Sequence, residues 1–285
     1  MNILFALSLS IALVIHSRRK KSLSVDGAAA AFILGMVTFS SSFWVFTVIL
    51  MTFFLSSSKL TKFKAERKKM LEAEYEASSE RNAIQVLCNG LAGGIAVFLF
   101  QLFCNNKSTT NDICFDHTRL SVVLLWAYVG HYGCCAGDTW ASELGILNKE
   151  WPILITRMKK VPPGTNGGVS GLGLAASLAG GALVGLSGAF TLALEQPCHG
   201  FAWELIVLGS FAGLGGSLID SLLGATVQQS LYSEDRKKIV PEKVKEDENI
   251  KVISGIPLLD NHQVNILSSF IMTFICGWIA FYLYP

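Results

Sequence analysis

Charged side chains are scarce in this sequence of 285 residues, where Asp, Glu, Lys and Arg together make up 15%. A soluble domain carries about 25% charged residues, because it needs them to cover its surface. Hydrophobic residues make up 51% of the chain, and the mean hydropathy is +0.47. The scarcity of charge excludes an ordinary soluble domain and predicts that most of the exterior faces lipid.

Paired cysteine motifs are also missing. The seven cysteines include no CxxC pair, which excludes a zinc cassette and a dense disulfide framework. Cys134 and Cys135 are adjacent in an apolar run, where small buried hydrophobes are expected. Cys104 and Cys114 fall in a segment that we place on the non-cytosolic side, so a bridge between these two cysteines stays open.

The chain contains several long apolar stretches. A spanning helix needs about 20 mainly apolar residues. No basic region precedes the first stretch, which predicts a membrane anchor with its N-terminus outside rather than a cleavable signal peptide. We divide the run 25–58 near Ser41, because one straight helix of that length would overshoot the bilayer. The predicted spans are 1–16, 25–40, 41–58, 83–103, 119–136, 169–194, 201–227 and 264–283.

The distribution of basic residues supports this count. With eight helices, four connecting segments lie on one side of the membrane and hold 4, 7, 4 and 6 of the 23 Lys and Arg residues. Only Lys107 and Arg119 fall elsewhere, so the positive-inside rule makes these segments cytosolic. They are 17–24, the charged segment 59–82, 148–168 and the loop 228–263.

The predicted fold is therefore an all-α integral membrane protein, a polytopic bundle of about eight transmembrane helices in a single domain over residues 1–285. Glycine is abundant within the predicted spans, as in 171–188 and 209–225. Small residues let membrane helices approach closely, so we expect Gly-rich faces to pack the bundle.

Acidic residues gather at the cytosolic ends of the predicted spans. This topology brings five acids to one boundary, and they are Asp26, Asp138, Glu143, Asp220 and Asp260. Ionisable residues at membrane segments are costly and mark functional sites by default. Any one of these acids could instead cap a helix or pair with a lysine, and the set together favours function.

Two of the acids are suited to a metal ion. If the fifth helix continues through residues 138–143, Asp138 and Ser142 share one face, and Thr139 and Glu143 share another. Mg²⁺ prefers one or two carboxylates together with water and substrate phosphates. We therefore predict a Mg²⁺ site at Asp138 and Asp220.

A glycine-rich loop follows in RMKKVPPGTNGGVSGLG, residues 157–173. Its glycines allow close backbone approach, and exposed N–H groups at the start of the next helix would bind an anion. Lys159 and Lys160 add positive charge. The GK[ST] ending of a Walker A loop is missing, and a tight turn into a helix is the simpler alternative.

Several long motifs resemble the transmembrane protein 19 family over nearly the whole chain. They are FFLSSSKLTKFKAE at 53–66, QVLCNG at 85–90, AGDTWASELG at 136–145, VPPGTNGGVSGLG at 161–173, GLGGSLIDSLLGAT at 213–226 and LLDNHQVN at 258–265. The plant members of this family include a phytyl-phosphate kinase, which adds a second phosphate to an isoprenoid monophosphate. The resemblance implies a membrane enzyme of the endoplasmic reticulum with its site facing the cytosol.

A more distant similarity, carried by GDTWASELG and the following turn, is to dolichol kinase and other CTP-using polyprenol kinases. It implies that Asp138 binds metal or nucleotide. It also implies that phosphate is held by Lys159, Gly164, Thr165, Asn166, Gly167 and Gly168. This chain has Pro163 where the kinase turn often carries an acid, and His262 where a second Asn is expected. The first departure leaves the nucleotide open between CTP and ATP.

The sequence thus predicts a kinase that transfers a phosphoryl group from CTP or ATP to a prenyl or polyprenyl monophosphate. Asp138, Glu143, Asp220 and Lys159 would form its catalytic set, and the lipid tail would lie among the Gly-rich helices. Further substrate contacts are expected from Asp26, Thr139, Ser142, Asp260 and Asn261. The alternative is a transporter or scramblase for lipids or small solutes, since broken Gly-rich helices also suit transport.

Overall fold

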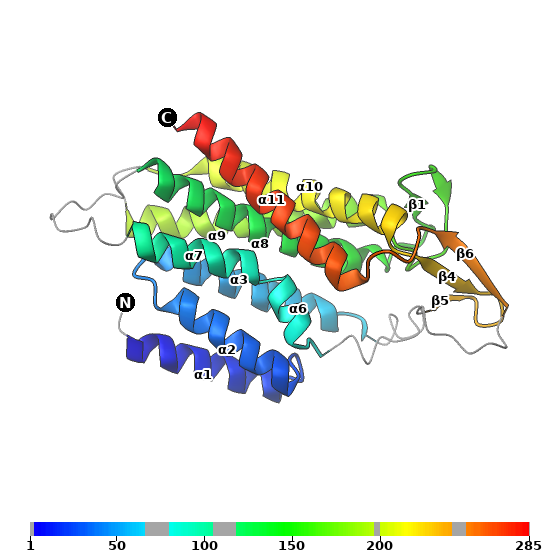
Figure 1. Cartoon of the computed structure of the whole chain (residues 1–285), viewed down its shortest axis with the longest axis horizontal. Helices are drawn as coiled ribbons and strands as arrows, with labels where there is room; N and C mark the ends of the chain where they lie inside the picture. The colour runs from blue at the N-terminus through cyan, green and yellow to red at the C-terminus, as the bar shows by residue number, and fades with distance from the viewer. Residues whose placement is uncertain (1–2, 66–79, 105–117, 197–199, 241–248, 285) are drawn as a thin grey trace.

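The computed structural model describes residues 3–65, 80–104, 118–196, 200–240 and 249–284. Most of them form long helices that run side by side along one axis (Figure 1). Two small sheets lie at one end of the bundle, which we call the sheet end, and both chain termini lie at the opposite, terminal end. The helices are α1 Ile3–Arg19, α2 Val25–Phe39, α3 Trp44–Lys62, α6 Ala83–Cys88, α7 Leu91–Phe103, α8 Arg119–Gly145, α9 Gly171–Glu195, α10 Trp203–Val227 and α11 Asn261–Leu283.

The lengths and apolar compositions of several helices are those expected of a membrane protein. Among the described residues, α3, α8, α9, α10 and α11 are long and apolar enough to cross a bilayer. Two shorter apolar helices, α2 with 15 residues and α7 with 13, match further predicted stretches. The helical class is thus confirmed with five candidate spans, and the count of eight crossings stays a prediction.

Helix α8 forms the centre of the bundle. It contacts α3, α7, α9, α10 and α11, and its side chains from Val122 to Gly137 include a long buried run. In this run the Tyr128 hydroxyl donates a hydrogen bond of 2.7 Å to the Phe46 carbonyl oxygen of α3. In a bilayer such partners matter, because no water is available to satisfy a buried hydroxyl.

The packing of α8, α9 and α10 depends on glycine. A Cβ on Gly137 would lie 2.5 Å from Cα of Gly213, and a Cβ on Gly181 would overlap the Gly209 carbonyl oxygen. The three backbones are therefore in direct contact, as expected for membrane helices that pack through small residues. This contact leaves no space for a lipid tail between the glycine faces of these three helices, and the wider prediction that the tail lies among the Gly-rich helices stays a prediction.

The predicted span 83–103 is broken into α6 and α7 at Asn89 and Gly90. At Gly90 the backbone packs closely against the Leu34 side chain of α2, since a Cβ there would lie 2.6 Å from a Leu34 methyl group. The carbonyl oxygen of Asn89 lies 3.1 Å from His131 Nε2 on α8. The histidine thus satisfies a backbone group near the break, which is the structural role expected of a buried histidine.

Helices α1 and α2 form a separate layer on this bundle. Their own small apolar cluster, centred on Ala6, Leu13 and Phe39, packs on the flank of α3. The layer is tied to the start of α6 by a parallel bridge between Leu23 and Arg81.

Polar contacts close the terminal end. The Arg119 guanidinium donates hydrogen bonds of 3.0 and 2.6 Å to the Phe281 carbonyl oxygen, near the end of α11. The Glu195 carboxylate accepts hydrogen bonds of 3.1 and 3.0 Å from the Trp44 backbone N–H at the start of α3. Cys114 and most of the charged segment 59–82 lie outside the described residues, so the possible Cys104–Cys114 bridge and that segment stay predictions.

The segment 228–263 is not the loop that the sequence suggested. Strands β4 Ser230–Ser233, β5 Lys238–Val240 and β6 Ile250–Ser254 form an antiparallel sheet in the order β5-β4-β6. A second small sheet combines β1 Ile153–Leu154, β2 Lys159–Lys160 and β3 Gly168–Val169. Strands this short give little periodicity, and the many nearby charges hid their alternating apolar residues.

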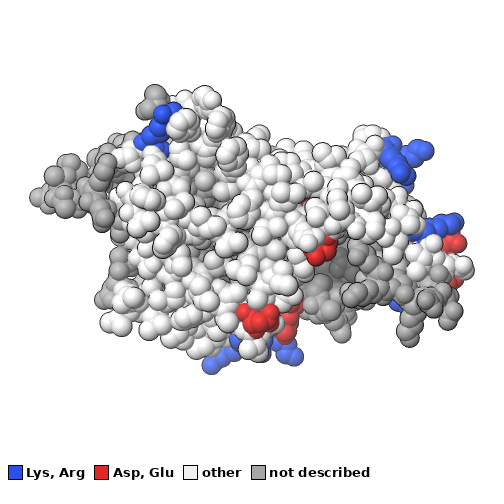
Figure 2. Space-filling model, viewed as in Figure 1, with Lys and Arg blue, Asp and Glu red and all other residues white. Residues whose placement is uncertain are grey.

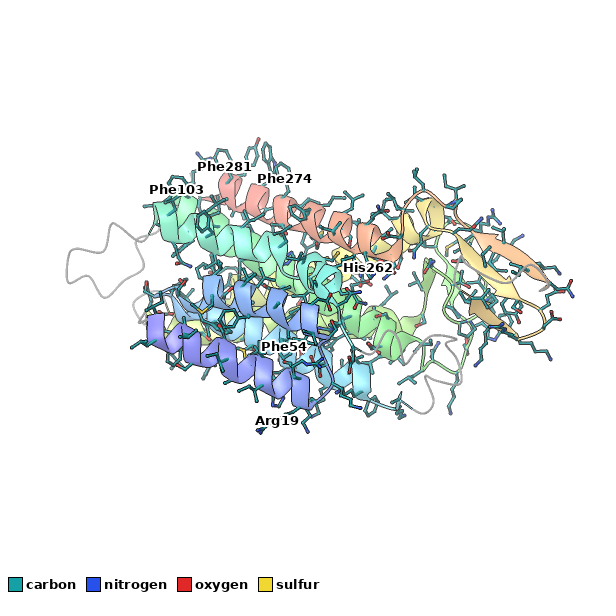
Figure 3. All side chains as sticks on the ribbon, turned by 60° about the horizontal axis from the view of Figure 1, so that its bottom comes forward. Arg19, Phe54, Phe103, His262, Phe274 and Phe281 are labelled. Atoms are coloured by element: carbon teal, nitrogen blue, oxygen red, sulfur yellow. The ribbon has the colours of Figure 1, made fainter. Side chains whose placement is uncertain are left out.

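The exterior of the helical body is apolar. Figure 2 shows a broad uncharged face over the helices, with charged residues mainly towards the sheet end and along the lower edge. Phe103, Phe274 and Phe281, labelled in Figure 3, are 55%, 67% and 42% exposed on α7 and α11. Such exposed aromatic side chains on a helical surface are suited to contact with lipid.

Candidate functional site

A cavity of about 330 Å³ lies where the helices α8, α9, α10 and α11 meet the loops of the sheet end. Nine residues singled out in the sequence line it, and they are Asp138, Ser142, Gly164, Thr165, Asn166, Gly167, Gly168, Asp220 and Asn261. These residues come from three helices and one loop that are far apart along the chain. The fold therefore gathers most of the candidate site in one place.

Glycine contacts position the two central carboxylates. Asp138 follows Gly137 on α8, and Asp220 lies two turns beyond Gly213 on α10, the glycine that touches Gly137. The cavity begins where this close packing ends, so both carboxylates line the same space. The glycine faces thus have a structural role that sets the distance between two acid-bearing helices.

Helix α11 holds the Asp220 side chain from the other side. The Ser268 hydroxyl donates a hydrogen bond of 3.2 Å to Asp220 Oδ2. The side-chain amide of Asn265, in the orientation that satisfies its hydrogen bonds, donates to the same oxygen at 3.1 Å and to the Asn261 carbonyl oxygen at 3.0 Å. Two neutral donors therefore orient this carboxylate without neutralising it.

The glycine-rich loop is a folded turn rather than an open set of N–H groups. The backbone N–H of Thr165 donates to the Pro162 carbonyl oxygen at 3.2 Å, and that of Gly168 donates to Thr165 at 2.9 Å. The Asn166 N–H donates to the Ser230 hydroxyl at 3.0 Å. The prediction of exposed loop amides is therefore wrong at these three positions, because the turn and strand β4 use them.

Two glycines shape this loop, and Gly167 lets it approach α10. Gly164 and Gly167 have φ of +85° and +78°, a region that favours glycine. At Gly167 a Cβ would also lie 2.5 Å from the Ser221 carbonyl oxygen on α10. The loop is thus held against the cavity wall that carries Asp220.

The start of α9 supplies the positive end of a helix dipole to the cavity. Ser170 caps this helix by accepting a hydrogen bond of 3.1 Å from the Gly173 N–H, and Ser170, Gly173 and Leu174 line the cavity. A helix N-terminus favours a negatively charged group nearby. Lys159 does not add to this effect, because it lies in β2 with an exposed side chain outside the cavity lining.

The described lining of the cavity is acidic. It includes Asp138, Glu150 and Asp220, and it includes no Lys, Arg or His. No group of three or more His, Cys, Asp or Glu side chains within the described ranges is arranged to hold a metal ion by itself. A pair of carboxylates that shares a cation with a ligand is the arrangement that fits this lining.

Four other predicted site residues lie outside the cavity. Glu143 and Thr139 are on the part of α8 that does not line it, and the charge of Glu143 acts on Arg81 instead. Asp26 accepts a hydrogen bond of 2.9 Å from the Ala83 N–H, so it joins the starts of α2 and α6. Asp260 caps α11 by accepting 2.9 Å from the Gln263 N–H. Both carboxylates therefore accept backbone N–H groups at helix starts, which is a structural role.

Helical spacing would have found residues that the sequence analysis missed. Ser217, Asp220, Ser221 and Gly224 follow the i, i+3, i+4 and i+7 pattern of one helix face, and all four line the cavity. Asn265 lies one turn after Asn261 in the same way. No comparable pattern marks Asn148 and Glu150, which lie in a loop, or Gln228, which follows the end of α10.

The long apolar helices, the apolar exterior and a polar cavity at one end define a multi-pass integral membrane protein. The chain belongs to the family described as integral membrane protein DUF92, whose model matches residues 8–273. The narrower resemblance to the transmembrane protein 19 family stays a prediction.

Relatives of the chain occur in plants and archaea. It is 39% identical to Protein PGR of Arabidopsis thaliana, over 99% of this chain and 97% of that relative. It is 26% identical to membrane protein MJ0933 of Methanocaldococcus jannaschii, over 76% and 79%. It is 25% identical to Protein VTE6, chloroplastic, of Arabidopsis thaliana, over 72% of this chain and 56% of that relative. No solved structure matches the chain significantly.

Proposed function

We propose that this protein is a membrane kinase that transfers a phosphoryl group from CTP or ATP to a prenyl or polyprenyl monophosphate. The observation that carries the proposal is the pair Asp138 and Asp220 in a cavity at the end of the bundle, beside the N-terminus of α9. Its acceptor class is supported by the motif resemblance to a family that includes a phytyl-phosphate kinase.

The cavity residues fit a Mg²⁺ ion shared with phosphate. Bare carboxylates repel a nucleoside triphosphate, and the described lining offers no cationic side chain to offset that repulsion. Mg²⁺ takes one or two carboxylates with water and phosphate oxygens, so Asp138 and Asp220 would hold it. When bound, the ion supplies positive charge to the donor phosphates.

The chain's own groups then position the reactants. Ser268 and Asn265 keep the Asp220 carboxylate turned towards the cavity, and the α9 N-terminus favours the negative charge of a phosphate. A terminal oxygen of the lipid phosphate forms a bond to the γ-phosphorus, the bond to the β-phosphate oxygen breaks, and a nucleoside diphosphate leaves. The acceptor oxygen is already ionised at neutral pH, so no protein base is needed.

A transporter or scramblase is the alternative, and the packing argues against it. Transport needs a path past the middle of the membrane, with a site near the midplane. Here the glycine faces of α8, α9 and α10 are in backbone contact beneath the cavity, for example at Gly137 and Gly213. The location in the endoplasmic reticulum with the site facing the cytosol also stays a prediction, and the name of one plant relative places that protein in the chloroplast.

A thermal stability measurement on the purified protein separates these functions. We expect CTP or ATP to raise the melting temperature only when Mg²⁺ is present, and EDTA to remove the effect. Asp138→Asn and Asp220→Asn should lose the response. Asp235→Asn, which removes an exposed carboxylate outside the cavity, should keep it. Nucleotide-independent lipid or solute flux in proteoliposomes, with no response to either nucleotide, would favour transport.

A further inference from the structure

A narrow apolar groove lies between the α1–α2 layer and the helices α3 and α6. Its apolar lining includes Leu13, Ala31, Phe39, Leu50, Phe53 and Phe54, and Figure 3 labels Phe54. The α2 residues that line the groove run from Ala31 to Phe39, which is about 12 Å of helix at 1.5 Å per residue. Three polar side chains, Arg81, Gln85 and Asn89, also line it.

Arg81 is held at the sheet end of this groove by its backbone. Its N–H donates a hydrogen bond of 3.1 Å to the Ser22 carbonyl oxygen, and its own carbonyl oxygen accepts 3.1 Å from the Ser24 N–H. These bonds follow directly on the C-terminal end of α1 and precede α2, so the guanidinium lies near the predicted cytosolic boundary of the membrane.

The charge of Arg81 has no ion-pair partner within the described part of the chain. Burial lowers the pKa of Arg81, and the charge of Glu143 partly opposes this shift. An arginine stays protonated under these conditions, and the half-buried Arg81 side chain is only partly solvated. A partly desolvated cation favours an anion, and a guanidinium binds phosphate well through paired hydrogen bonds.

The groove also offers a place where the hydrocarbon tail of a lipid could bind. The faces of α8, α9 and α10 are closed by glycine contacts, as at Gly181 and Gly209. The groove encloses about 50 Å³, which suits part of one hydrocarbon chain rather than the two chains of a glycerolipid. Its lining is almost wholly apolar apart from the three polar side chains.

We propose that this groove binds the hydrocarbon chain of a single-chain isoprenoid monophosphate, with the lipid phosphate at Arg81. This inference rests on the proposed kinase function and names where its acceptor is held. Cys135 of α8 is close enough to interact electrostatically with both Arg81 and Asp138. A phosphate at Arg81 would therefore lie near the same end of α8 that carries Asp138.

The test is photo-crosslinking of the full-length protein in nanodiscs by a geranylgeranyl monophosphate that carries a diazirine on its tail. We expect labelling of peptides from α2 and α3, and unlabelled geranylgeranyl monophosphate should compete for it. Ala31→Phe fills the groove and Arg81→Gln removes its cation, so each should weaken labelling by about tenfold or more. Ala29→Phe on the exposed side of α2 and Arg157→Gln in an exposed loop are matched controls and should label normally.

Several results would contradict the proposal that this groove binds the isoprenoid chain. Labelling mapped to α9 and α10, labelling that no isoprenoid phosphate competes for, or normal labelling of both groove variants would each do so. The positions of the labelled peptides in the unaltered protein test the proposal even if a variant fails to fold.

Failure of the groove can be told apart from failure of the kinase. If the unaltered protein makes no lipid diphosphate but α2 and α3 are still labelled and the labelling is competed, the lipid site is supported and the kinase function is contradicted. If the protein makes the diphosphate and the Ala31 and Arg81 variants are labelled normally, the lipid site is contradicted and the kinase function is supported.

Discussion

At the scale of single residues, acids that look alike in the sequence have different surroundings. Asp138 and Asp220 line the cavity, whereas Asp26 and Asp260 accept backbone N–H groups at helix starts. The topology predicted which acids share a membrane boundary. It could not predict which of them accept backbone N–H groups, because a carboxylate at a helix end is suited both to that role and to binding a metal ion.

Ser268 acts on the site through Asp220, so Ser268→Ala tests the orientation of that carboxylate. We expect the Mg²⁺ concentration for half-maximal activity to rise by about 10- to 100-fold, because groups that orient a metal ligand contribute on this scale. Thr273→Ala is the matched control on α11, since the Thr273 hydroxyl donates only within its own helix, to Ser269 at 2.7 Å. An unchanged Mg²⁺ requirement in Ser268→Ala would show that Asp220 does not depend on this hydrogen bond.

Asp260→Ala should affect stability rather than chemistry. Loss of the α11 cap is expected to cost about 1 kcal/mol of folding free energy, because one N–H at the helix start loses its acceptor. The melting temperature should fall, and Asp260→Asn, which can still cap, should restore it. Full stability with lost phosphoryl transfer in Asp260→Ala would instead place this carboxylate in the reaction.

At the scale of elements, hydropathy predicted where the helices lie, but not how they are interrupted or joined. The apolar stretch 83–103 was predicted as one span, whereas the structure breaks it at Asn89 and Gly90, where the Asn89 carbonyl oxygen contacts His131 of another helix. The direction of Lys159 was equally hidden, because it depends on how β2 pairs with β1. Such tertiary contacts leave no local pattern in the sequence.

The contact between α9 and α10 is sensitive to a single methyl group. Gly181→Ala should destabilise the protein by about 1–3 kcal/mol, because its Cβ overlaps the Gly209 carbonyl oxygen and forces the backbones apart. Gly171→Ala, at the start of the same helix, meets nothing within 4 Å and should be neutral or slightly stabilising. Equal melting temperatures for the two variants would contradict the close packing of these helices.

At the scale of the whole molecule, the fold places both termini at one end and the cavity at the other (Figure 1). The positive-inside rule assigns the sheet end to the cytosol. Epitope tags on the two termini should therefore both resist antibodies added from the cytosolic side until the whole membrane is permeabilised. A tag in the exposed turn at residues 156–158 should be accessible at once. Termini on opposite sides would rule out an even number of crossings.

The central claim is that the cavity of Asp138 and Asp220 transfers phosphate to an isoprenoid monophosphate. The most direct measurement supplies the purified protein with Mg²⁺, γ-labelled CTP or ATP, and phytyl, geranylgeranyl or dolichyl monophosphate, and follows label in the lipid diphosphate. We expect labelled product from at least one pairing, and a loss of about 100-fold or more in Asp138→Asn and Asp220→Asn. No labelled diphosphate from any pairing, or equal product from these variants, would contradict the account.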